Sequence, residues 1–572
     1  MRRSSYPVRR MFIVLLGVVG LFVAIWLQVV RWQVLYAREQ PSDWQAAASP
    51  QNMGTIVDTL GMPLAFDAPA YTLVIDRRLI PEGQEAQIRQ WLVDLGIPGE
   101  QVERTWAQDL PVVEFRHLGY EVAEVARQQI LVLQERNITP WLRVDTEWIR
   151  VFPQGTEAAH VLGFRNWERP PRSFGGVHEF YEFFLLTGQG FQPEFVHLAE
   201  RPGGTSPFFP SPYDRDLVLT LHMGVQHWVE QELARAVERY EAKGGTVIVM
   251  DPRDGRILAM AIQPTYDPNR FYEANQDQWL NRAIASPYEP GSVVKALTFS
   301  IAVDTGAITE TTKILDTGSM PYGSIMIRNS QHKAYGPVTP EQILTYSLNV
   351  PTAKVAIMLG PETFYRYMDL FGLARRTEID LAGEVAGLMR HPRDPMWSIS
   401  DLASNSFGQG LAVTPIQLIR AMAIIANGGR AITPHVVRGF ERDGHYWEVE
   451  WPMGTRVIRE ETARTVTRWL TTVVDNISVP DRTTLRVAGK TGTAQVPDLE
   501  HGGYKPDAQN VTFVGYFPAE NPQVIMLVYI EQPQKGPLAV DPSYIWAFNT
   551  AYPTFVRIAD HIIPLLDIEE AP

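Results

Sequence analysis

The sequence of 572 residues contains no cysteine. Disulfides, thiol catalysis and zinc–thiolate sites are therefore excluded, while the cellular compartment is left open. The chain also lacks the His-Glu-x-x-His motif of zinc proteases, a P-loop and the glycine pattern of dinucleotide-binding folds. Its net charge is −13 at pH 7, so the composition does not indicate the basic domain that nucleic-acid binding requires. These absences predict a folded, acidic protein without thiol chemistry and without a nucleic-acid partner.

One long uncharged run stands out, Met11–Val30, and it follows four arginines within residues 1–10. A run of this length can span a bilayer as a helix. Because positive charge stays inside, we expect a cytoplasmic tail at 1–10, a transmembrane helix at 11–32 and an extracytoplasmic remainder. The alternative is a cleaved signal peptide, but its apolar region is usually shorter, and no Ala-x-Ala site follows directly.

Residues 33–215 give structural signals but no catalytic constellation. Apolar residues alternate in Tyr71–Ile75, which predicts a strand. Apolar stripes at helical spacing begin at Ile88 and at Val122. We therefore expect a spacer or docking domain here rather than an enzyme.

The composition changes at Asp216, where a second region begins. An apolar stripe from Val225 to Tyr240 predicts a helix, and two strands are predicted around the turn Asp251–Gly255. Three further strands are predicted at Leu485–Val487, Thr512–Phe517 and Val524–Ile530. A last helix is predicted at Tyr544–Ile563, interrupted or divided near Pro553. Because strands lie at both ends of the region, we expect an α+β domain whose first and last strands join one antiparallel sheet.

The segment Tyr288–Lys295 combines a hydroxyl and an amine at a predicted helix start. Pro290 and Gly291 mark a turn, and the apolar run after them predicts a buried helix beginning at Ser292. Side chains three residues apart share one helix face. Because burial disfavours the charged amine, Lys295 is a candidate general base beside the nucleophile Ser292. The alternative is a serine cap followed by a lysine that reaches solvent, and the motif alone is weak.

Two other segments carry groups that would complete such a site. Tyr346–Asn349 places a hydroxyl and an amide two residues apart, as suits a loop facing a cleft, although a helix cap or turn explains the same residues. Val487–Gln495 resembles a strand with Lys490 and Gly492 on one side, where the glycine leaves room for a substrate backbone. Lys490 and Thr493 would supply a cation and a hydroxyl for a carboxylate. The alternative is an edge strand protected by a lysine.

The three motifs Ser292-x-x-Lys295, Ser347-x-Asn349 and Lys490-Thr-Gly492 occur in the order typical of penicillin-binding proteins and serine β-lactamases. Many other segments resemble class B penicillin-binding proteins. They are Gly54–Asp58, Phe152–Gly155, Ala158–Gly163, Gly175–Glu179, Met250–Ala259, Tyr288–Lys295, Ser406–Gly410, Thr414–Gln417, Ala426–Gly429, Ala488–Ala494 and Phe513–Pro518. The resemblance therefore covers nearly the whole chain.

This resemblance implies a bacterial cytoplasmic-membrane protein with one membrane-spanning helix and its N-terminus inside. It implies an elongated pedestal (dimerisation-type) domain at 33–215, a transpeptidase domain at 216–566 with a five-stranded antiparallel sheet flanked by helices as in serine β-lactamases, and a tail at 567–572. No metal or organic cofactor is implied. Four residues depart from the family pattern, and they leave pedestal contacts and fine substrate fit open: Met53, Thr59, His222 and Pro351.

By the same resemblance, the reaction is the cross-linking of peptidoglycan stem peptides that end in D-Ala-D-Ala, and β-lactam antibiotics would acylate the same serine. The implied catalytic residues are Ser292, Lys295, Ser347 and Lys490, and the implied substrate-binding residues are Asn349, Thr491, Gly492 and Thr493. The backbone N–H groups of Ser292 and Thr493 would form the oxyanion hole. The resemblance also implies that the pedestal and the membrane helix dock a glycosyltransferase of the SEDS family.

Two other functions are compatible with these motifs. A D,D-carboxypeptidase or β-lactamase would use water in place of the acceptor amine, and Glu289 is a candidate deacylating carboxylate only through its position beside the motif. A non-catalytic β-lactam sensor would need a cytoplasmic signalling segment, for which residues 1–10 leave little room. The predicted membrane anchor and the long front region favour the cross-linking transpeptidase over both alternatives.

Overall fold

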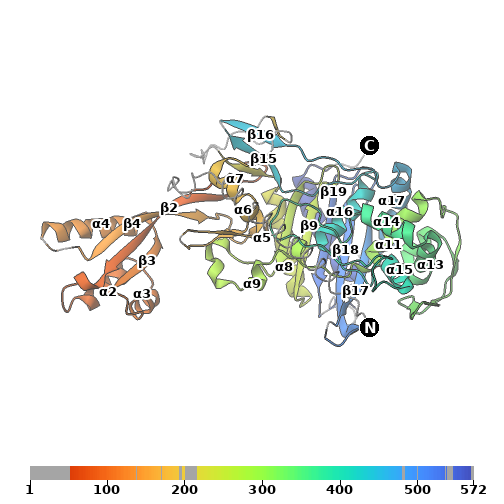
Figure 1. The fold of residues 1–572 in the computed structure, drawn as a ribbon, viewed down its shortest axis with the longest axis horizontal. Coiled ribbons are helices and arrows are strands. Elements are labelled where there is room, and N and C mark those ends of the chain that lie inside the picture. The colour runs from red at the N-terminus through yellow and green to blue at the C-terminus, as the bar shows by residue number, and fades with distance from the viewer. Residues whose placement is uncertain are drawn as a thin grey trace, which may run out of the picture. The chain divides into compact units, whose positions relative to one another are not determined.

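The computed structural model describes residues 52–568, except 137, 139, 169, 192–195, 200–214, 443, 479–482, 499, 535 and 537–544. The predicted tail at 1–10 and transmembrane helix at 11–32 lie outside these described residues. Within the part of the chain that is described, no helix is long and apolar enough to cross a bilayer. The chain from Met53 onward forms one structural unit, drawn in Figure 1.

The front region is built on antiparallel strands covered by helices. Its elements are β1 (Ile56–Val57), β2 (Pro63–Asp76), α2 (Glu85–Asp94), α3 (Gly99–Trp106), β3 (Val112–Leu118), α4 (Tyr120–Glu135) and β4 (Leu142–Val151). β2 pairs with both β3 and β4, and the helices close over them around buried Leu73, Phe115 and Leu142. The predicted strand Tyr71–Ile75 lies within β2, and the two predicted stripes are α2 and α4, so these predictions are confirmed.

An eight-stranded sheet joins segments from both halves of the chain. Its path is β3-β2-β1-β8-β15-β16-β7, with β4 paired to β2. The additional elements of this part are α5 (Ala159–Leu162), β5 (Phe164–Arg165), β6 (Ser173–Phe174), α6 (Gly176–Phe180), α7 (Glu182–Thr187), β7 (Val196–Leu198), β8 (Leu217–Leu219), β15 (Val437–Arg442) and β16 (His445–Val449). Strands that follow Asp216 therefore complete a sheet begun in the front region, which sequence patterns did not reveal.

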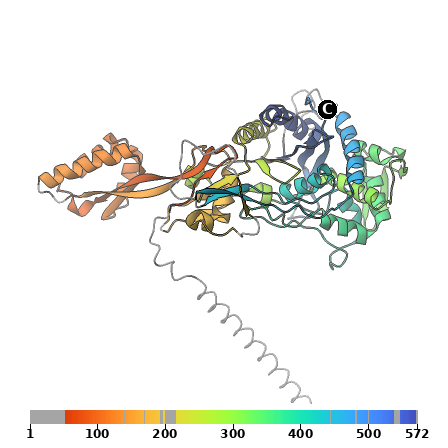
Figure 2. The same ribbon diagram turned by 90° about the horizontal axis from the view of Figure 1, so that it is seen from above.

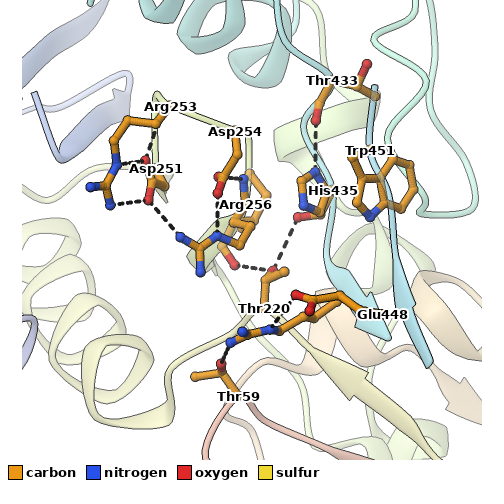
Figure 3. Close-up of polar contacts among 12 residues, drawn as sticks. Thr59, Thr220, Asp251, Arg253, Asp254, Arg256, Thr433, His435, Glu448 and Trp451 are labelled. Atoms are coloured by element: carbon orange, nitrogen blue, oxygen red, sulfur yellow. Dashed lines mark hydrogen bonds and ion pairs between the residues drawn. The ribbon is translucent and has the colours of Figure 1, made fainter. Parts of the chain in front are cut away.

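Polar contacts connect this sheet to the rest of the unit (Figure 3). Arg438 of β15 donates to Thr59 Oγ1 at 3.3 Å and to Glu448 Oε1 at 3.2 Å. Thr220, just after β8, donates to Ile257 O at 2.6 Å. A guanidinium from a distant strand thus lies beside Thr59, one of the four residues that depart from the expected pattern.

The second region contains the predicted five-stranded antiparallel sheet. Its strands are β9 (Gly244–Met250), β10 (Ile257–Gln263), β17 (Ala488–Pro497), β18 (Tyr504–Phe517) and β19 (Val524–Glu531), in the order β10-β9-β19-β18-β17. All neighbours are antiparallel, and β9 pairs with β19 as predicted. The predicted strand Leu485–Val487 is wrong, because the ladder with β18 begins only at Ala488.

Helices cover both faces of this sheet, and Figure 2 shows α18 beside α8. Val247 and Val249 of β9 share an apolar core with α8 (Met223–Arg239) and α18 (Ala551–Leu565). Ile248 and Met250 point to the other core, which holds α11 (Val294–Asp304), α16 (Pro415–Ala426) and α17 (Glu460–Asp475). Strand alternation thus places the sheet between two apolar layers.

Two sequence features of these helices have a local explanation. His222, another departure from the family pattern, caps α8 by accepting from Val225 N–H at 3.3 Å, so the orphan donor of the helix start is satisfied. Pro553 lies in the first turn of α18, where a proline removes no helical hydrogen bond. The predicted division near Pro553 falls at Thr550, which separates the 3-10 turn η6 (Ala547–Asn549) from α18.

The segment between β10 and β15 is mostly helical and supplies the elements around the site. They are η4 (Pro268–Glu273), α9 (Gln276–Trp279), α10 (Arg282–Ala285), η5 (Gly291–Val293), β11 (Ile314–Asp316), β12 (Ser319–Tyr322), β13 (Ile325–Arg328), β14 (Gly336–Val338), α12 (Pro340–Tyr346), α13 (Asn349–Leu359), α14 (Pro361–Leu370) and α15 (Ile399–Ser406). Two short 3-10 turns lie elsewhere, η2 (Arg77–Leu79) and η6 (Ala547–Asn549).

Candidate active site

Ser292 lies in the short 3-10 turn η5, which runs directly into α11. The helical segment thus starts close to the predicted position, but its first turn is 3-10 rather than α. Gly291 has a φ of +56°, a conformation that favours glycine. Ser292 is half-buried, and its hydroxyl makes no hydrogen bond with any described residue. An unengaged hydroxyl at this turn is available to a ligand.

Lys295 lies in the first turn of α11 and is completely buried, as predicted. Its Nζ donates to Ser347 O at 2.5 Å, to Asn349 Oδ1 at 2.7 Å and to Ser347 Oγ at 3.3 Å. No carboxylate is within ion-pair distance of Nζ among the described residues. Burial, together with the nearby charge of Lys490, lowers the pKa of Lys295 well below its ordinary value. Burial thus disfavours the charged form of this amine.

Ser347 and Asn349 join two helices at a sharp corner. Ser347 follows α12 with a φ of +55°, which ends that helix, and Asn349 begins α13. Asn349 Nδ2 donates to Arg328 O at 2.9 Å, so its carboxamide is oriented with Oδ1 toward Lys295. Ser347 is thus a helix cap, as the alternative interpretation predicted, and the same corner turns both side chains toward Lys295.

Lys490 approaches the same hydroxyl from β17. Its Nζ donates to Ser347 Oγ at 3.1 Å and to Thr491 O at 3.2 Å. Lys490 is 1% exposed, and burial lowers its pKa to about 7. Ser347 Oγ is therefore held between two buried amines, one from α11 and one from β17. This arrangement suits proton transfer through a hydroxyl.

β17 is the last strand of its sheet, so one of its edges is unpaired within the described residues. Thr491 and Thr493 are half-buried on it, and Thr493 Oγ1 accepts from Ala547 N–H at 3.3 Å. Gly492 is buried, and a Cβ there would lie 2.7 Å from Pro290 O and 3.0 Å from a Val293 methyl. The glycine therefore admits the turn that carries Ser292. The expectation that it leaves room for a substrate backbone is wrong on that face.

Sequence reasoning missed Asn329 and did not predict the supporting contacts of Glu289. Asn329 Oδ1 accepts from the N–H groups of Asn349 at 3.0 Å and Val350 at 3.1 Å, which fixes the start of α13. Glu289 accepts from Gly410 N–H at 2.9 Å and from Tyr504 O–H at 3.1 Å. The sequence motif that contains Gly410 was a signal for the contact between Gly410 and Glu289. Asn329 is an isolated asparagine in a loop, and nothing in the sequence around it indicated its role.

Comparisons with known proteins identify the family of this chain. Residues 245–544 match the penicillin-binding protein transpeptidase domain, and residues 50–166 match the penicillin-binding protein dimerisation domain. The chain belongs to the class B penicillin-binding proteins. The resemblance expected from the three motifs is thereby confirmed, as is the two-domain organisation at the level of the family.

Several relatives align with nearly the whole of this penicillin-binding protein. It is 30% identical over 543 residues to the probable peptidoglycan D,D-transpeptidase PenA of Neisseria gonorrhoeae. The alignment covers 92% of this chain and 88% of that one. It is 28% identical over 528 residues to the peptidoglycan D,D-transpeptidase FtsI of Escherichia coli, covering 89% of this chain and 84% of that one. The apo crystal structure of penicillin-binding protein 3 from Mycobacterium tuberculosis superposes with a TM-score of 0.66 at 25% identity, covering 92% and 98% of the two chains.

Proposed function

We propose that this protein is a peptidoglycan D,D-transpeptidase in which Ser292 is the residue acylated by the donor stem peptide. One observation carries the assignment of the site. Ser347 Oγ lies 3.3 Å and 3.1 Å from the buried amines of Lys295 and Lys490, and both pKa values are lowered. A structural lysine is rarely buried without a carboxylate partner, so two such lysines around one hydroxyl support a catalytic role.

In the acylation step, neutral Lys295 removes the proton of Ser292 as Oγ attacks the carbonyl carbon of the penultimate D-Ala. Ser347 passes a proton to the departing D-Ala amine, with Lys490 holding its hydroxyl. The backbone N–H groups of Ser292 and Thr493 stabilise the oxyanion, a contribution of roughly 3 kcal/mol per donor in comparable sites. Lys490, Thr491 and Thr493 bind the terminal carboxylate of the donor, and Asn349 contacts its amide.

In the second step, an amine of a neighbouring stem attacks the ester and the cross-link forms. The competing function is hydrolysis by water on the same scaffold. Glu289 is the carboxylate that the sequence placed nearest to the motif, and its oxygens accept from Gly410 and Tyr504. Burial raises the pKa of Glu289, and the preference for transfer over hydrolysis rests on the predicted anchor and the long front region rather than on this carboxylate. A penicillin adduct that persists for many minutes supports the transferase, and rapid penicillin turnover supports the hydrolase.

The test is covalent labelling of the full-length protein with a fluorescent penicillin. Ser292→Ala should abolish the label while the protein stays folded. Ser300→Ala is a matched control, because Ser300 lies two turns further along α11 and its hydroxyl donates to Ala296 O at 2.8 Å. Mass spectrometry should place the adduct on Ser292. A label that survives in Ser292→Ala would remove Ser292 from the mechanism.

The N-terminal part of the proposal rests on sequence. A single-pass anchor at 11–32 would hold the pedestal (33–215), the transpeptidase domain (216–566) and the tail (567–572) outside a bacterial cytoplasmic membrane. The pedestal and the anchor would dock a SEDS-family glycosyltransferase, whose glycan product the transpeptidase then cross-links. Co-purification of the two proteins should fail when both regions are replaced. Co-purification that persists would argue against this partner.

A further inference from the structure

A buried carboxylate lies near the corner that carries Ser347 and Asn349. Asp316 is the last residue of β11 and is only 1% exposed. Among the described residues, no lysine, arginine or histidine lies within ion-pair distance of its oxygens. A carboxylate is costly to bury unless donors satisfy its oxygens. Asp316 therefore depends on neutral donors.

Three residues donate to the carboxylate of Asp316. Its Oδ1 accepts from Gly318 N–H at 3.1 Å, and its Oδ2 accepts from Tyr335 N–H at 3.0 Å. The side-chain amide of Asn329 lies across both oxygens, with Nδ2 at 3.0 Å from Oδ1 and at 2.9 Å from Oδ2. The carboxylate thus holds two backbone groups and one side chain, and the side chain continues beyond it.

Asp316 determines which way the Asn329 amide faces. A carboxylate only accepts, so the Nδ2 end must face it, and Nδ2 also donates to Lys333 O at 3.0 Å. The oxygen end then faces the start of α13, where it accepts from Asn349 N–H at 3.0 Å and from Val350 N–H at 3.1 Å. The reverse orientation would place donor against donor and acceptor against acceptor. The orientation of this buried amide is therefore fixed.

The same amide replaces a missing cap of α13, a helix labelled in Figure 1. Leu348, the residue before α13, makes no side-chain hydrogen bond to the first turn. Asn329 satisfies two N–H groups of that turn from a distant part of the chain. Asn349 is also held through its side chain, because its Nδ2 donates to Arg328 O at 2.9 Å. Arg328 and Asn329 thus hold both the backbone and the carboxamide of Asn349.

Asn349 carries this constraint to the amine of Lys295. Its Oδ1 accepts from Lys295 Nζ at 2.7 Å. From the Asp316 carboxylate, the path runs through the Asn329 amide and Asn349, with successive contacts of 2.9, 3.0 and 2.7 Å. Asp316, Asn329 and Lys295 are all buried, so water does not compete for these contacts.

We propose that Asp316 is a positioning residue of the transpeptidase reaction, which holds the Asn349 carboxamide against the base Lys295 by fixing the amide of Asn329. The inference rests on the function proposed above, because Asp316 acts only through Lys295. Without the carboxylate, the Asn329 amide can turn over, and the corner that carries Asn349 loosens. Burial is the main cause of the lowered pKa of Lys295, so a loosened corner that admits water should raise that pKa.

The test measures acylation of the full-length protein by benzylpenicillin, in stopped-flow experiments at a series of pH values through the rise of the wild-type rate. Asp316→Asn keeps the shape of the side chain but replaces one acceptor oxygen by a donor. It should move the pH of half-maximal rate upward by about half a unit or more, which is about a threefold loss of rate on the rising limb. The first-order rate of acylation should carry the loss, with the apparent dissociation constant of penicillin unchanged. At high pH the variant should approach the wild-type rate.

Glu384→Gln is the matched control for altering a buried carboxylate that holds backbone groups. Glu384 accepts from Thr377 N–H at 2.6 Å and from Glu378 N–H at 3.1 Å, and these partners lie outside the site. The control should lower the melting temperature without moving the pH of half-maximal rate, because a merely structural loss reduces the active fraction equally at every pH. Lys490, whose charge also lowers the pKa of Lys295, stays in place in every variant.

A second variant tests the path itself. Asn329→Ala should produce the same shift as Asp316→Asn. The double variant should shift no further than Asn329→Ala alone, because the carboxylate acts through the amide. Circular dichroism checks the fold of each variant, and either single variant tests the shift if the other does not fold.

Each outcome decides the proposal. A shift in Asp316→Asn that is absent in Glu384→Gln, and that does not add to the shift of Asn329→Ala, supports it. An unchanged or lowered pH of half-maximal rate, an equal shift in Glu384→Gln, or shifts that add in the double variant overturn it. A wild-type protein that penicillin does not acylate at Ser292 would instead overturn the proposed function, so the two failures are distinguishable.

Discussion

Replacing Lys490 with methionine should stabilise the protein while inactivating it, because the buried amine is costly to keep charged. Burial lowers the pKa of Lys490 from 10.5 to about 7. At pH 7 the unfolded lysine is fully protonated and the folded one about half protonated, which corresponds to about 4 kcal/mol of lost stability. Methionine fills a similar volume without charge. It forfeits the contacts with Ser347 and Thr491, worth ~1 kcal/mol each, so a net gain of about 2 kcal/mol is expected at pH 7.

The gain should depend on pH with a fixed sign. The folded pKa lies below the unfolded one, so between about 7 and 10.5 the unfolded state binds more protons and the stability of the wild-type protein rises with pH. The advantage of Lys490→Met is therefore largest below pH 7 and declines as the pH increases. Between pH 7 and pH 9 it should shrink by about 2 kcal/mol, enough to cancel the net gain.

The assay is urea unfolding, followed by intrinsic fluorescence, at pH 6, 7, 8 and 9. Lys354→Met is the control for deleting a lysine, since Lys354 Nζ lies toward the surface and donates to Leu315 O at 2.7 Å. A stability difference between wild type and Lys490→Met that stays constant from pH 6 to pH 9 would refute the reasoning. A constant difference would mean that packing, rather than the buried charge, determines the stability at this position.

Two further predictions follow from the same site. The rate of acylation by penicillin should rise with pH and level off well before the ordinary pKa of a lysine is reached, because the pKa of Lys295 is lowered well below that value; a rate that keeps rising toward pH 10 in stopped-flow measurements would exclude Lys295 as the base. Gly492→Ala should destabilise the protein by about 1–3 kcal/mol and slow acylation, because its Cβ would lie 2.7 Å from Pro290 O. Gly119→Ala, which meets nothing within 4 Å, is the control, and equal unfolding midpoints for the two variants would contradict the packing argument.

Local patterns were sufficient for most of the elements that carry the site. The apolar run after Ser292 predicted a buried α11, and alternation around Lys490 predicted β17, both because burial imposes its own period on a sequence. Pairing between distant segments was not predictable in the same way. Leu485–Val487 has the composition of a strand, but its position before the start of the ladder with β18 leaves it irregular. Composition reports the tendency to extend, whereas a strand also needs a partner edge.

The misinterpretation of Gly492 has the same physical origin. Strand alternation correctly placed the glycine and Lys490 on one side of β17, and the sequence suggested a vacant surface there. The structure fills that surface with Pro290 and Val293, which are neighbours of Ser292 on a different element. Gly492 is thus what allows β17 to lie against the turn of the nucleophile.

The two buried lysines reach Ser347 because two unrelated close contacts bring their elements together. One is the packing of Gly492 on the Ser292 turn, and the other is the capping of α13 by Asn329, which fixes the corner that carries Ser347. Neither contact involves a charged group, yet each helps to determine how close the amines of Lys295 and Lys490 lie to the Ser347 hydroxyl. The energetic cost of burying Lys295 and Lys490 without carboxylates is therefore borne by apolar and backbone contacts elsewhere in the domain. Weakening those contacts should raise the pKa of both lysines before it unfolds the protein, since water would reach the amines first.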